Sequence, residues 1–292
     1  METHVAVLVL DTPILGVAET FGDFGDNVCT LLQDLPFPLV KYQIAFDDYT
    51  SEANIAQTDA TLVQLARDID SKVVRGVVLT GSRSDLFATD IPWLVLLDRF
   101  IQDVLLCRAG FPMVGICFGH QVLAKNLGCK VGRNTAENGW EAGIHTVALN
   151  KSIVDIELSP FRKALLTADG KLLEHINLVQ FHMDVVYSNP PATSTQPLLA
   201  ATTFQNVGNT PKCSIQGLIT ELGPIKVLTF QGHPEFISDE ALAMLKRLYD
   251  NGSMDKASYE RLAYKTSNLE NQGQLIGQVI RDFICTYYDT LA

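Results

Sequence analysis

Hydrophobic positions along the first half of the chain follow two alternating patterns. Short apolar runs, typical of strands covered on both faces of a sheet, predict strands at residues 5–10, 39–46, 73–79 and 112–116. Apolar residues three and four positions apart predict helices at residues 52–69, from Pro92 with Asp90 as its N-cap, and from Gly119 to Gly128. Strands and helices that alternate with short connections indicate an α/β fold, an open and mostly parallel sheet with helices on both faces.

The second half of the chain has a different pattern. From residue 129, strand-like runs follow one another without clear helices between them, at residues 144–149, 178–181, 198–204, 214–220 and 226–230. From Ser238 the pattern is helical to the end of the sequence, and the last helix has one apolar face. Because no repeat or linker intervenes, we expect one domain over residues 1–250 and a helical extension, residues 251–292, packed on it.

The composition of the 292 residues limits the classes of function. With 47% hydrophobic residues the chain can form a sizeable core. Its 22 Lys and Arg against 33 Asp and Glu give a net charge of −11 without a basic cluster, which disfavours nucleic acid and anionic membranes as partners. The first residues lack the positive charge of a signal peptide, and no apolar run reaches the about 18 residues of a membrane helix. We therefore expect a cytoplasmic protein.

The six cysteines are scattered along the sequence, which contains neither a Cys-x-x-Cys pair nor a Cys/His cluster at zinc spacing. In a chain of this length they are interpreted as reduced thiols, and five of them, Cys213 included, as small apolar residues. We expect no metal and no cofactor. The sixth cysteine, Cys117, has a different sequence context.

Cys117 lies in the stretch Gly115-Ile116-Cys117-Phe118-Gly119-His120-Gln121, which follows an apolar run and begins a helix. Gly-x-Cys-x-Gly at such a place is typical of a nucleophile on a tight strand-to-helix turn, because glycines on both sides avoid clashes. The positive end of the following helix favours the thiolate, which is the reactive form of a cysteine. The backbone N–H of Phe118 is the natural first donor to an oxyanion formed beside the sulfur.

His233 and Glu235 form the second candidate group, directly after the apolar run at residues 225–230. A histidine at the end of a strand lies where open α/β sheets keep their catalytic groups. Glu235 follows across Pro234 and can hydrogen-bond the imidazole, as the third member of a nucleophile, base and carboxylate arrangement. The alternative is a capping histidine beside a surface glutamate. Together with Cys117, the pattern predicts a Cys–His–Glu triad.

With these motifs the chain resembles the class I glutamine amidotransferase domain, which combines a Gly-x-Cys-x-Gly-x-Gln turn with a late Gly-His-Pro-Glu. The resemblance covers roughly residues 1–250. It implies a flavodoxin-like fold and a nucleophilic acyl transfer. In that reaction Cys117 attacks the γ-carboxamide carbon of glutamine, His233 relays the proton to the leaving amine, and Glu235 orients His233.

The resemblance also implies roles for residues around the thiol. Leu79-Thr80-Gly81-Ser82 corresponds to the family's oxyanion loop, so the N–H of Gly81 is expected to join that of Phe118 as an oxyanion donor. Gln121, together with His182 and Asp184 of the stretch Phe181-His182-Met183-Asp184, is expected to contact the substrate.

The oxyanion loop departs from the family pattern. Most members have Gly-Gly-Pro, whereas this chain has Gly81-Ser82-Arg83, a bulkier turn. This loop is more similar to the stand-alone branch of the family, which includes GMP-synthase-like proteins and the plant γ-glutamyl peptidases.

Three functions remain open from the sequence. The first is a glutaminase that delivers ammonia to a separate synthetase subunit, because the sequence contains no Gly-rich phosphate loop of an ATP-using domain. The second is a γ-glutamyl peptidase or hydrolase acting on glutathione-like compounds without a partner. In both, the substrate is a small molecule, glutamine or a γ-glutamyl compound. The third is a non-catalytic regulatory or binding protein with the same fold, and the intact triad argues against it.

Two further side chains allow more than one interpretation. His120 is interpreted as a packing or hydrogen-bonding residue and not as a second base. For Trp140, a place on the substrate side and packing within its own loop both remain open.

Overall fold

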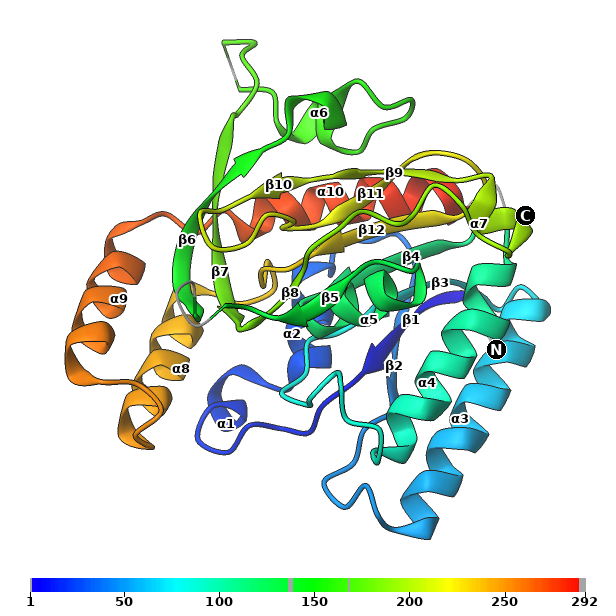
Figure 1. The fold of residues 1–292 in the computed structure, drawn as a ribbon, viewed down its shortest axis with the longest axis horizontal. Coiled ribbons are helices and arrows are strands. Elements are labelled where there is room, and N and C mark those ends of the chain that lie inside the picture. Colours follow the sequence, from blue (N-terminus) through cyan, green and yellow to red (C-terminus); the bar gives the residue numbers. More distant parts are fainter. Residues whose placement is uncertain (1, 136–138, 168, 289–292) are drawn as a thin grey trace.

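A mostly parallel sheet runs through the centre of the molecule, with helices on both faces (Figure 1). The structure is a computed structural model that describes residues 2–135, 139–167 and 169–288. Over these residues the sheet has seven strands, in the order β2 (Leu39–Gln43), β1 (His4–Val9), β3 (Val74–Leu79), β4 (Pro112–Ile116), β12 (Lys226–Phe230), β11 (Leu218–Leu222) and β9 (Thr203–Asn206). The first five strands are parallel, in the order of flavodoxin-like sheets, and β11 runs antiparallel to both of its neighbours, β12 and β9. The predicted fold class is confirmed.

The helices of the described residues differ widely in length. They are α1 (Ala18–Phe21), α2 (Phe24–Leu31), α3 (Glu52–Asp70), α4 (Pro92–Asp103), α5 (Phe118–Asn126), α6 (Phe161–Ala164), α7 (Pro197–Ala200), α8 (Ser238–Asp250), α9 (Lys256–Asn268) and α10 (Gly273–Tyr288), with short 3₁₀ helices at Leu105–Cys107 and Lys151–Val154.

Each face of the sheet buries its own hydrophobic core. On one face α3, α4 and α5 pack against alternate strand residues, such as Ala6 and Leu8 of β1. On the other face α2 and α10 cover Val5 and Val7. Every residue of β1 is therefore buried, which explains why its apolar run is nearly continuous.

A second group of strands stands beside the central sheet. Strand β6 (Glu141–Leu149) pairs antiparallel with β7 (His175–His182) and with β10 (Gly208–Asn209), and β5 (Val131–Arg133) pairs with β8 (Asp184–Val186). Helices α8 and α9 lie against β6 (Figure 1). Because Val179 of β7 bridges to His233, the end of β7 is held at the carboxyl edge of the parallel strands.

Several predicted elements need correction. The strand expected at residues 198–204 is instead α7 followed by β9, because Pro197 occupies the first helical turn and the Gln196 side chain accepts from Leu199 N. The strand expected at 214–220 begins only at Leu218, since Gln216 N donates to Gly208 O, on β10 and outside the central sheet.

The ends of two other elements also differ from expectation. The N-cap of α4 is Ile91 and not Asp90, and it makes no side-chain cap. The second strand ends at Gln43, short of Phe46. Helix α2, which the apolar pattern missed, begins with a reciprocal cap between Asp23 and Asp26.

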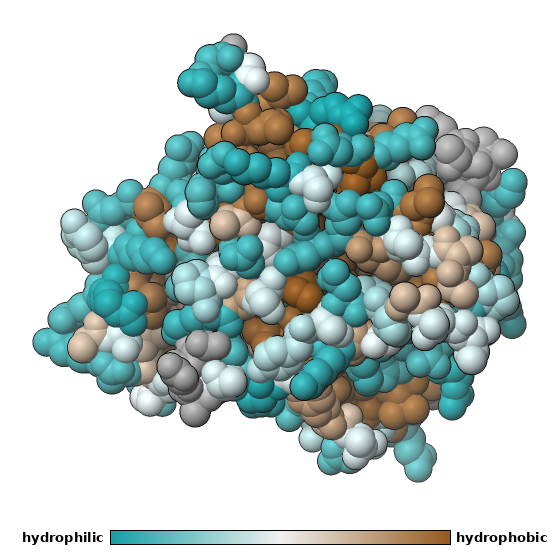
Figure 2. Space-filling view, turned by 45° about the horizontal axis from the view of Figure 1, so that its top comes forward, coloured by the Kyte–Doolittle hydropathy of each residue, from teal (hydrophilic) through white to brown (hydrophobic). Residues whose placement is uncertain are grey.

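The last helix belongs to the main core. Ile276, Ile280, Phe283 and Ile284 of α10 are buried against the sheet, so this helix is one of its covering layers. The division of the chain at residue 250 stays a prediction. No helix among the described residues is long and apolar enough to cross a membrane. In the face shown in Figure 2, hydrophobic residues are interspersed with hydrophilic ones.

Candidate active site

Cys117 occupies the turn between β4 and α5, at the carboxyl edge of the parallel strands. Its backbone has φ 51° and ψ −102°, a conformation that costs a residue with a side chain on the order of 1–3 kcal/mol. The turn is held on both sides, since Cys117 N donates to Phe230 O at 2.8 Å and Gly119 N to Thr80 O at 3.1 Å. Gly119 has to be a glycine, because a Cβ there would lie 2.3 Å from the carbonyl oxygen of Leu79.

The Cys117 thiol is almost enclosed, with 5% of the residue exposed. Its Sγ lies 3.9 Å from the carbonyl oxygen of Phe181 and 3.8 Å from Nε2 of Gln231. Gln121, expected at the substrate, donates from Nε2 to Gln231 at 3.2 Å and to the carbonyl oxygen of Asp184 at 2.8 Å. Its amide nitrogen therefore ties α5 to β8 beside the thiol.

His233 lies just beyond β12 and faces Cys117. Its Nδ1 pairs with Oε1 of Glu235 at 2.8 Å, and both side chains are buried. The ring stacks on Phe236, with centroids 4.3 Å apart and planes 9° from parallel. The backbone N–H of His233 donates to Val179 O at 2.8 Å. Backbone, carboxylate and aromatic ring together fix the imidazole and leave Nε2 for the thiol.

The charges around His233 decide its protonation. Burial by itself would lower the pKa of His233, but the neighbouring Cys117 and Glu235 outweigh it and raise that pKa to about 10. The imidazole is therefore a cation near neutral pH, next to the sulfur. An imidazolium in this place favours a thiolate and carries a proton for a leaving group.

The two expected oxyanion donors lie on neighbouring segments. The loop after β3 brings Gly81 against His233, so that a Cβ at Gly81 would lie 3.0 Å from Cε1 of the imidazole. Among the described residues, the N–H of Gly81 makes no backbone hydrogen bond. Phe118 is the first residue of α5, so its N–H has no acceptor within the helix. Arg83 of the same loop bonds Asp11 through N at 2.7 Å and Nη2 at 2.7 Å. This ion pair anchors the bulkier turn to the end of β1.

A cavity of about 400 Å³ opens over the thiol. Its lining includes Cys117, His233 and Gln121, and also His182 and Asp184. The structure therefore brings these predicted residues to one cavity, whereas Glu235 lies behind His233 and does not line it.

The two polar side chains on the cavity wall have partners in the protein. Asp184 pairs with Arg133 at 2.8 Å, and His182 with Glu141 at 3.0 Å. Trp140, half of which is exposed, also borders the cavity. His120 is buried away from it and hydrogen-bonds Thr229 Oγ1 at 2.8 Å.

The sequence reasoning missed two residues near the pair of Cys117 and His233. Gln231 directly precedes the Gly-His-Pro-Glu motif, and this position in the sequence could have indicated that its side chain lies near the thiol. Glu240, in the first turn of α8, accepts from Asn27 Nδ2 at 2.7 Å. Burial raises the pKa of Glu240 to about 7, the Asn27 hydrogen bond opposes the shift, and the charge of Glu235 adds to it. The carboxyl group of Glu240 is thus close enough to Glu235 for the two to interact electrostatically.

Comparisons with known proteins place this geometry in context. A family model described as glutamine amidotransferase class-I matches residues 99–251. A protein of Saccharomyces cerevisiae that is provisionally named a glutamine amidotransferase is 30% identical over 258 residues, 88% of this chain and 87% of the relative.

Two other proteins are more distant. Gamma-glutamyl peptidase 2 of Arabidopsis thaliana is 24% identical over 221 residues, 76% of this chain and 77% of the relative. A crystal structure of a glutamine amidotransferase from Thermotoga maritima superposes with a TM-score of 0.61 at 17% identity, over 99% of this chain and 100% of that one. This superposition supports the fold alone.

Proposed function

Because the chain belongs to the class I glutamine amidotransferase family, we propose that it hydrolyses or transfers the γ-glutamyl group of small amides with Cys117 as nucleophile. One observation carries the proposal, a thiol on a strained turn that faces an imidazole held by a carboxylate at 2.8 Å. Such a geometry serves acyl transfer, since the sulfur nucleophile, the proton donor and the orienting carboxylate are already placed together.

The proposed reaction has two steps. The Cys117 sulfur forms a bond to the γ-carbonyl carbon, the C–N bond breaks, and the leaving amine takes the proton from His233. Water or another acceptor then attacks the thioester, His233 takes up the proton of the attacking group, and the thiolate leaves. The N–H groups of Gly81 and Phe118 stabilise the oxyanion in both steps, each contributing about 3–4 kcal/mol by analogy with comparable sites.

The cavity wall supplies the binding groups in this proposal. Gln121, His182 and Asp184 border the space into which the γ-glutamyl group has to extend from the thiol. The carboxylate of Asp184 suits the α-ammonium group of such a substrate, because it lies at the surface of the cavity with Arg133 as its only ion-pair partner among the described residues. Glutamine is the substrate that the family name favours.

A γ-glutamyl peptide is the second candidate substrate. The cavity of about 400 Å³ falls within the range of sites that hold drug-sized ligands, about 300–1,000 Å³, so a substituent on the amide nitrogen has room. The Arabidopsis relative is named a γ-glutamyl peptidase. In this case no synthetase partner is needed, whereas a glutaminase would deliver its ammonia to a separate subunit. The cytoplasmic location and the lack of a nucleic-acid partner stay predictions.

Covalent labelling tests the proposal. The purified protein is treated with 6-diazo-5-oxo-norleucine, a glutamine-like electrophile, and peptide mass spectrometry locates the adduct. We expect one adduct, on Cys117, and none in Cys117→Ala, while Cys129→Ala serves as the matched loss of a buried thiol elsewhere. Protection by glutamine supports the amidotransferase, and protection by glutathione alone supports the peptidase. A protein that stays unlabelled would leave the non-catalytic alternative.

A further inference from the structure

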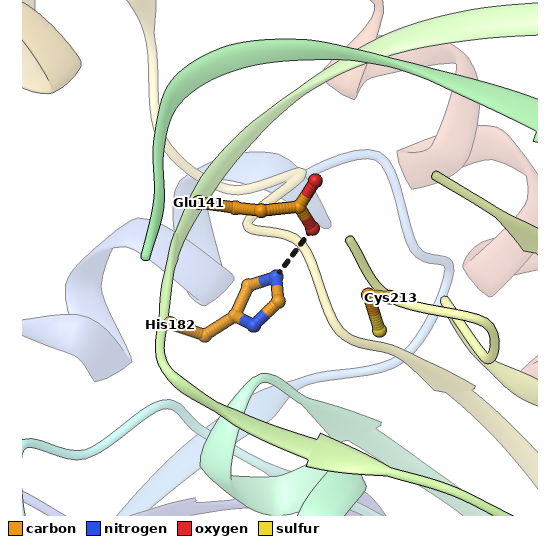
Figure 3. A group of neighbouring side chains, drawn as sticks. All are labelled: Glu141, His182 and Cys213. Atoms are coloured by element: carbon orange, nitrogen blue, oxygen red, sulfur yellow. Dashed lines mark ion pairs between the residues drawn. The ribbon is translucent and has the colours of Figure 1, made fainter. Parts of the chain in front are cut away.

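Three buried side chains with metal-binding atoms meet behind the cavity wall (Figure 3). Glu141 begins β6, His182 ends β7, and Cys213 lies in the loop between β10 and β11. One ligand atom from each lies within 4.8 Å of the other two. The side chains of Glu141 and His182 are 1% and 2% exposed, and Cys213 is 1% exposed, so bulk water does not solvate them.

The polar atoms of this group are poorly satisfied by the protein. The imidazole Nε2 and Oε2 of Glu141 form an ion pair at 3.0 Å, which leaves Nδ1 of His182 and Oε1 of Glu141 without a hydrogen-bond partner among the described residues. Buried polar atoms are normally paired, and leaving one unpaired costs about 1–3 kcal/mol. A carboxylate oxygen and an imidazole nitrogen this close together, each with a further unpaired polar atom in its own group, are arranged like ligands of a common ion.

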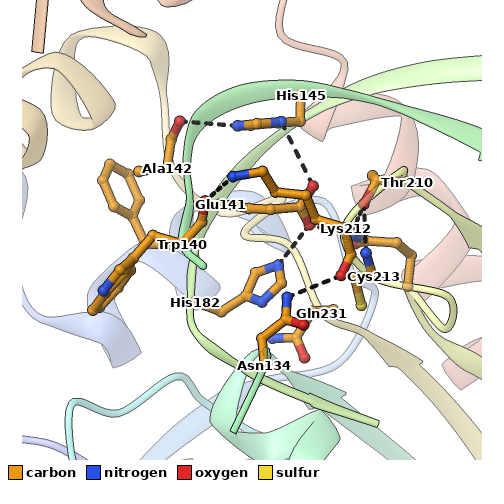
Figure 4. Close-up of polar contacts among 12 residues, drawn as sticks. Asn134, Trp140, Glu141, Ala142, His145, His182, Thr210, Lys212, Cys213 and Gln231 are labelled. Atoms are coloured by element: carbon orange, nitrogen blue, oxygen red, sulfur yellow. Dashed lines mark hydrogen bonds and ion pairs between the residues drawn. The ribbon is translucent and has the colours of Figure 1, made fainter. Parts of the chain in front are cut away.

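The surroundings hold the three side chains in place (Figure 4). Gln216 Nε2 donates to Oε2 of Glu141 at 2.9 Å, which orients the carboxylate. The backbone N–H of Cys213 donates to Thr210 Oγ1 at 3.1 Å, which fixes its loop. His145 Nδ1 lies 3.7 Å from Oε1 of this carboxylate, and the charge of Lys265 also acts on Glu141. Partners of this kind, which support the ligands from behind, accompany protein metal sites.

We propose that Glu141, His182 and Cys213 bind a divalent transition-metal ion of the Zn²⁺ class. Carboxylate oxygen, imidazole nitrogen and thiolate sulfur are the three donor types that Zn²⁺ takes in proteins, and water completes a tetrahedron. On binding, the Cys213 thiol releases its proton to solvent. The charges of thiolate and carboxylate then equal that of the ion, so the buried site is neutral.

The geometry requires only a small adjustment. Ligand atoms about 2.0–2.3 Å from a tetrahedral zinc lie roughly 3.3–3.7 Å from one another. The widest separation in the group, at most 4.8 Å, therefore has to close by roughly 1 Å. The carboxylate and imidazole are already at 3.0 Å. A turn of the Cys213 side chain supplies the movement, at the expense of the weak donation from its Sγ to Ile215 O at 3.2 Å.

The ion has a structural role beside the thiol site. It joins β6, β7 and the loop after β10, and His182 follows Phe181, whose carbonyl oxygen is 3.9 Å from the Cys117 sulfur. The ion thus fixes the strand end that forms the cavity wall. The ion takes no part in the acyl transfer, although His182 also borders the cavity that holds the proposed substrate.

Cobalt titration of the purified full chain tests the site. After chelator treatment, Co²⁺ is added and the thiolate-to-cobalt charge-transfer band is followed in the near ultraviolet. We expect a band that saturates at one Co²⁺ per chain and disappears on addition of Zn²⁺. Cys213→Ser should lose the band, whereas Cys129→Ser, another buried thiol, should keep it. Cys117→Ser should also keep it, which excludes the reactive thiol as the ligand.

A second variant keeps the test decisive if Cys213→Ser does not fold. His182→Asn should weaken Co²⁺ binding at least about tenfold while leaving the sulfur in place. In the Cys117→Ser background, Zn²⁺ should raise the melting temperature, and it should not do so once Cys213 is replaced. The proposal is overturned if no saturable band forms, if the band survives in Cys213→Ser, or if it is lost in Cys117→Ser. In those cases Glu141 and His182 are only a buried ion pair.

Discussion

The hydrogen bond between Glu235 and His233 offers the sharpest test of how the site works. Replacing Glu235 with Gln keeps the volume and a hydrogen-bonding group at 2.8 Å but removes the charge that supports the imidazolium. A hydrogen bond to a charged group contributes about 1.5–3 kcal/mol, which corresponds to roughly 1–2 pKa units at 1.36 kcal/mol per unit. The pKa of His233, raised to about 10 in the wild type, should therefore fall to roughly 8–9.

The pH dependence of activity reports this change. When His233 loses its proton, the leaving amine loses its proton donor, so kcat/KM falls on the alkaline side. That alkaline limb should move down by roughly 1–2 pH units in Glu235→Gln. At pH 7, kcat/KM should fall by roughly 10²- to 10⁴-fold, because the carboxylate also fixes the ring orientation. Glu221→Gln, an exposed glutamate of β11, is the matched control and should change neither quantity.

The interaction between Glu235 and His233 should also change how the free energy of unfolding depends on pH. The folded pKa of His233 lies above its ordinary value of 6.5, so the stabilisation is complete below about pH 6.5 and is lost as the pH rises towards 10. Because the variant's His233 titrates at roughly 8–9, the difference in unfolding free energy between wild type and Glu235→Gln should stay constant up to that pH and narrow between there and about pH 10. A His233 that titrates near 6.5 by NMR, or an alkaline limb that Glu235→Gln leaves in place, would refute the reasoning.

Three further predictions follow from the same region. The raised pKa of Glu240 means that the folded wild-type protein loses stability as the pH rises from 4.5 to about 7, and Glu240→Gln should remove this loss. Denaturant unfolding at pH 5 and pH 8 should show that the variant gains about 2–3 kcal/mol over the wild type between the two pH values. Gly81→Ala should reduce kcat more than it changes KM, because the new Cβ, 3.0 Å from the imidazole, displaces the base; steady-state kinetics would show it, and an unchanged kcat would speak against this placement. Gly119→Ala should destabilise the protein by more than about 2 kcal/mol, since the Cβ would meet the Leu79 carbonyl at 2.3 Å; thermal unfolding measures this, and a wild-type melting temperature would contradict the packing of the turn.

Local sequence patterns predicted much of the central sheet. Strand β1 is buried on both faces, so each of its positions favours an apolar residue, and the nearly continuous apolar run could be recognised in the sequence. Helix α7 was missed because a helix of four residues has too little periodicity, and its cap by Gln196 is not one of the frequent capping residues. Helix α2 was missed because its acidic cap, Asp23 with Asp26, lacks the usual Ser/Thr and Glu pattern.

Some residues of the candidate site could be predicted from local motifs, and others could not. Cys117 and the segment from Gly232 to Glu235 carry short motifs with a mechanical reason for each residue type, so the sequence could indicate them. Glu240 acts through its burial next to Glu235, which no local pattern encodes. The group of Glu141, His182 and Cys213 comes from three distant segments, and rules for zinc spacing apply only to ligands that are close in sequence.

The central claim is that Cys117 forms a covalent intermediate with the γ-glutamyl group of its substrate. Rapid acid quenching of the wild-type protein with glutamine or glutathione, followed by intact-mass and peptide analysis, measures it most directly. We expect a thioester adduct of one γ-glutamyl group on Cys117, formed as the amine is released, and neither adduct nor product in Cys117→Ala. Product formation by Cys117→Ala at the wild-type rate, or an adduct on another residue, would contradict it.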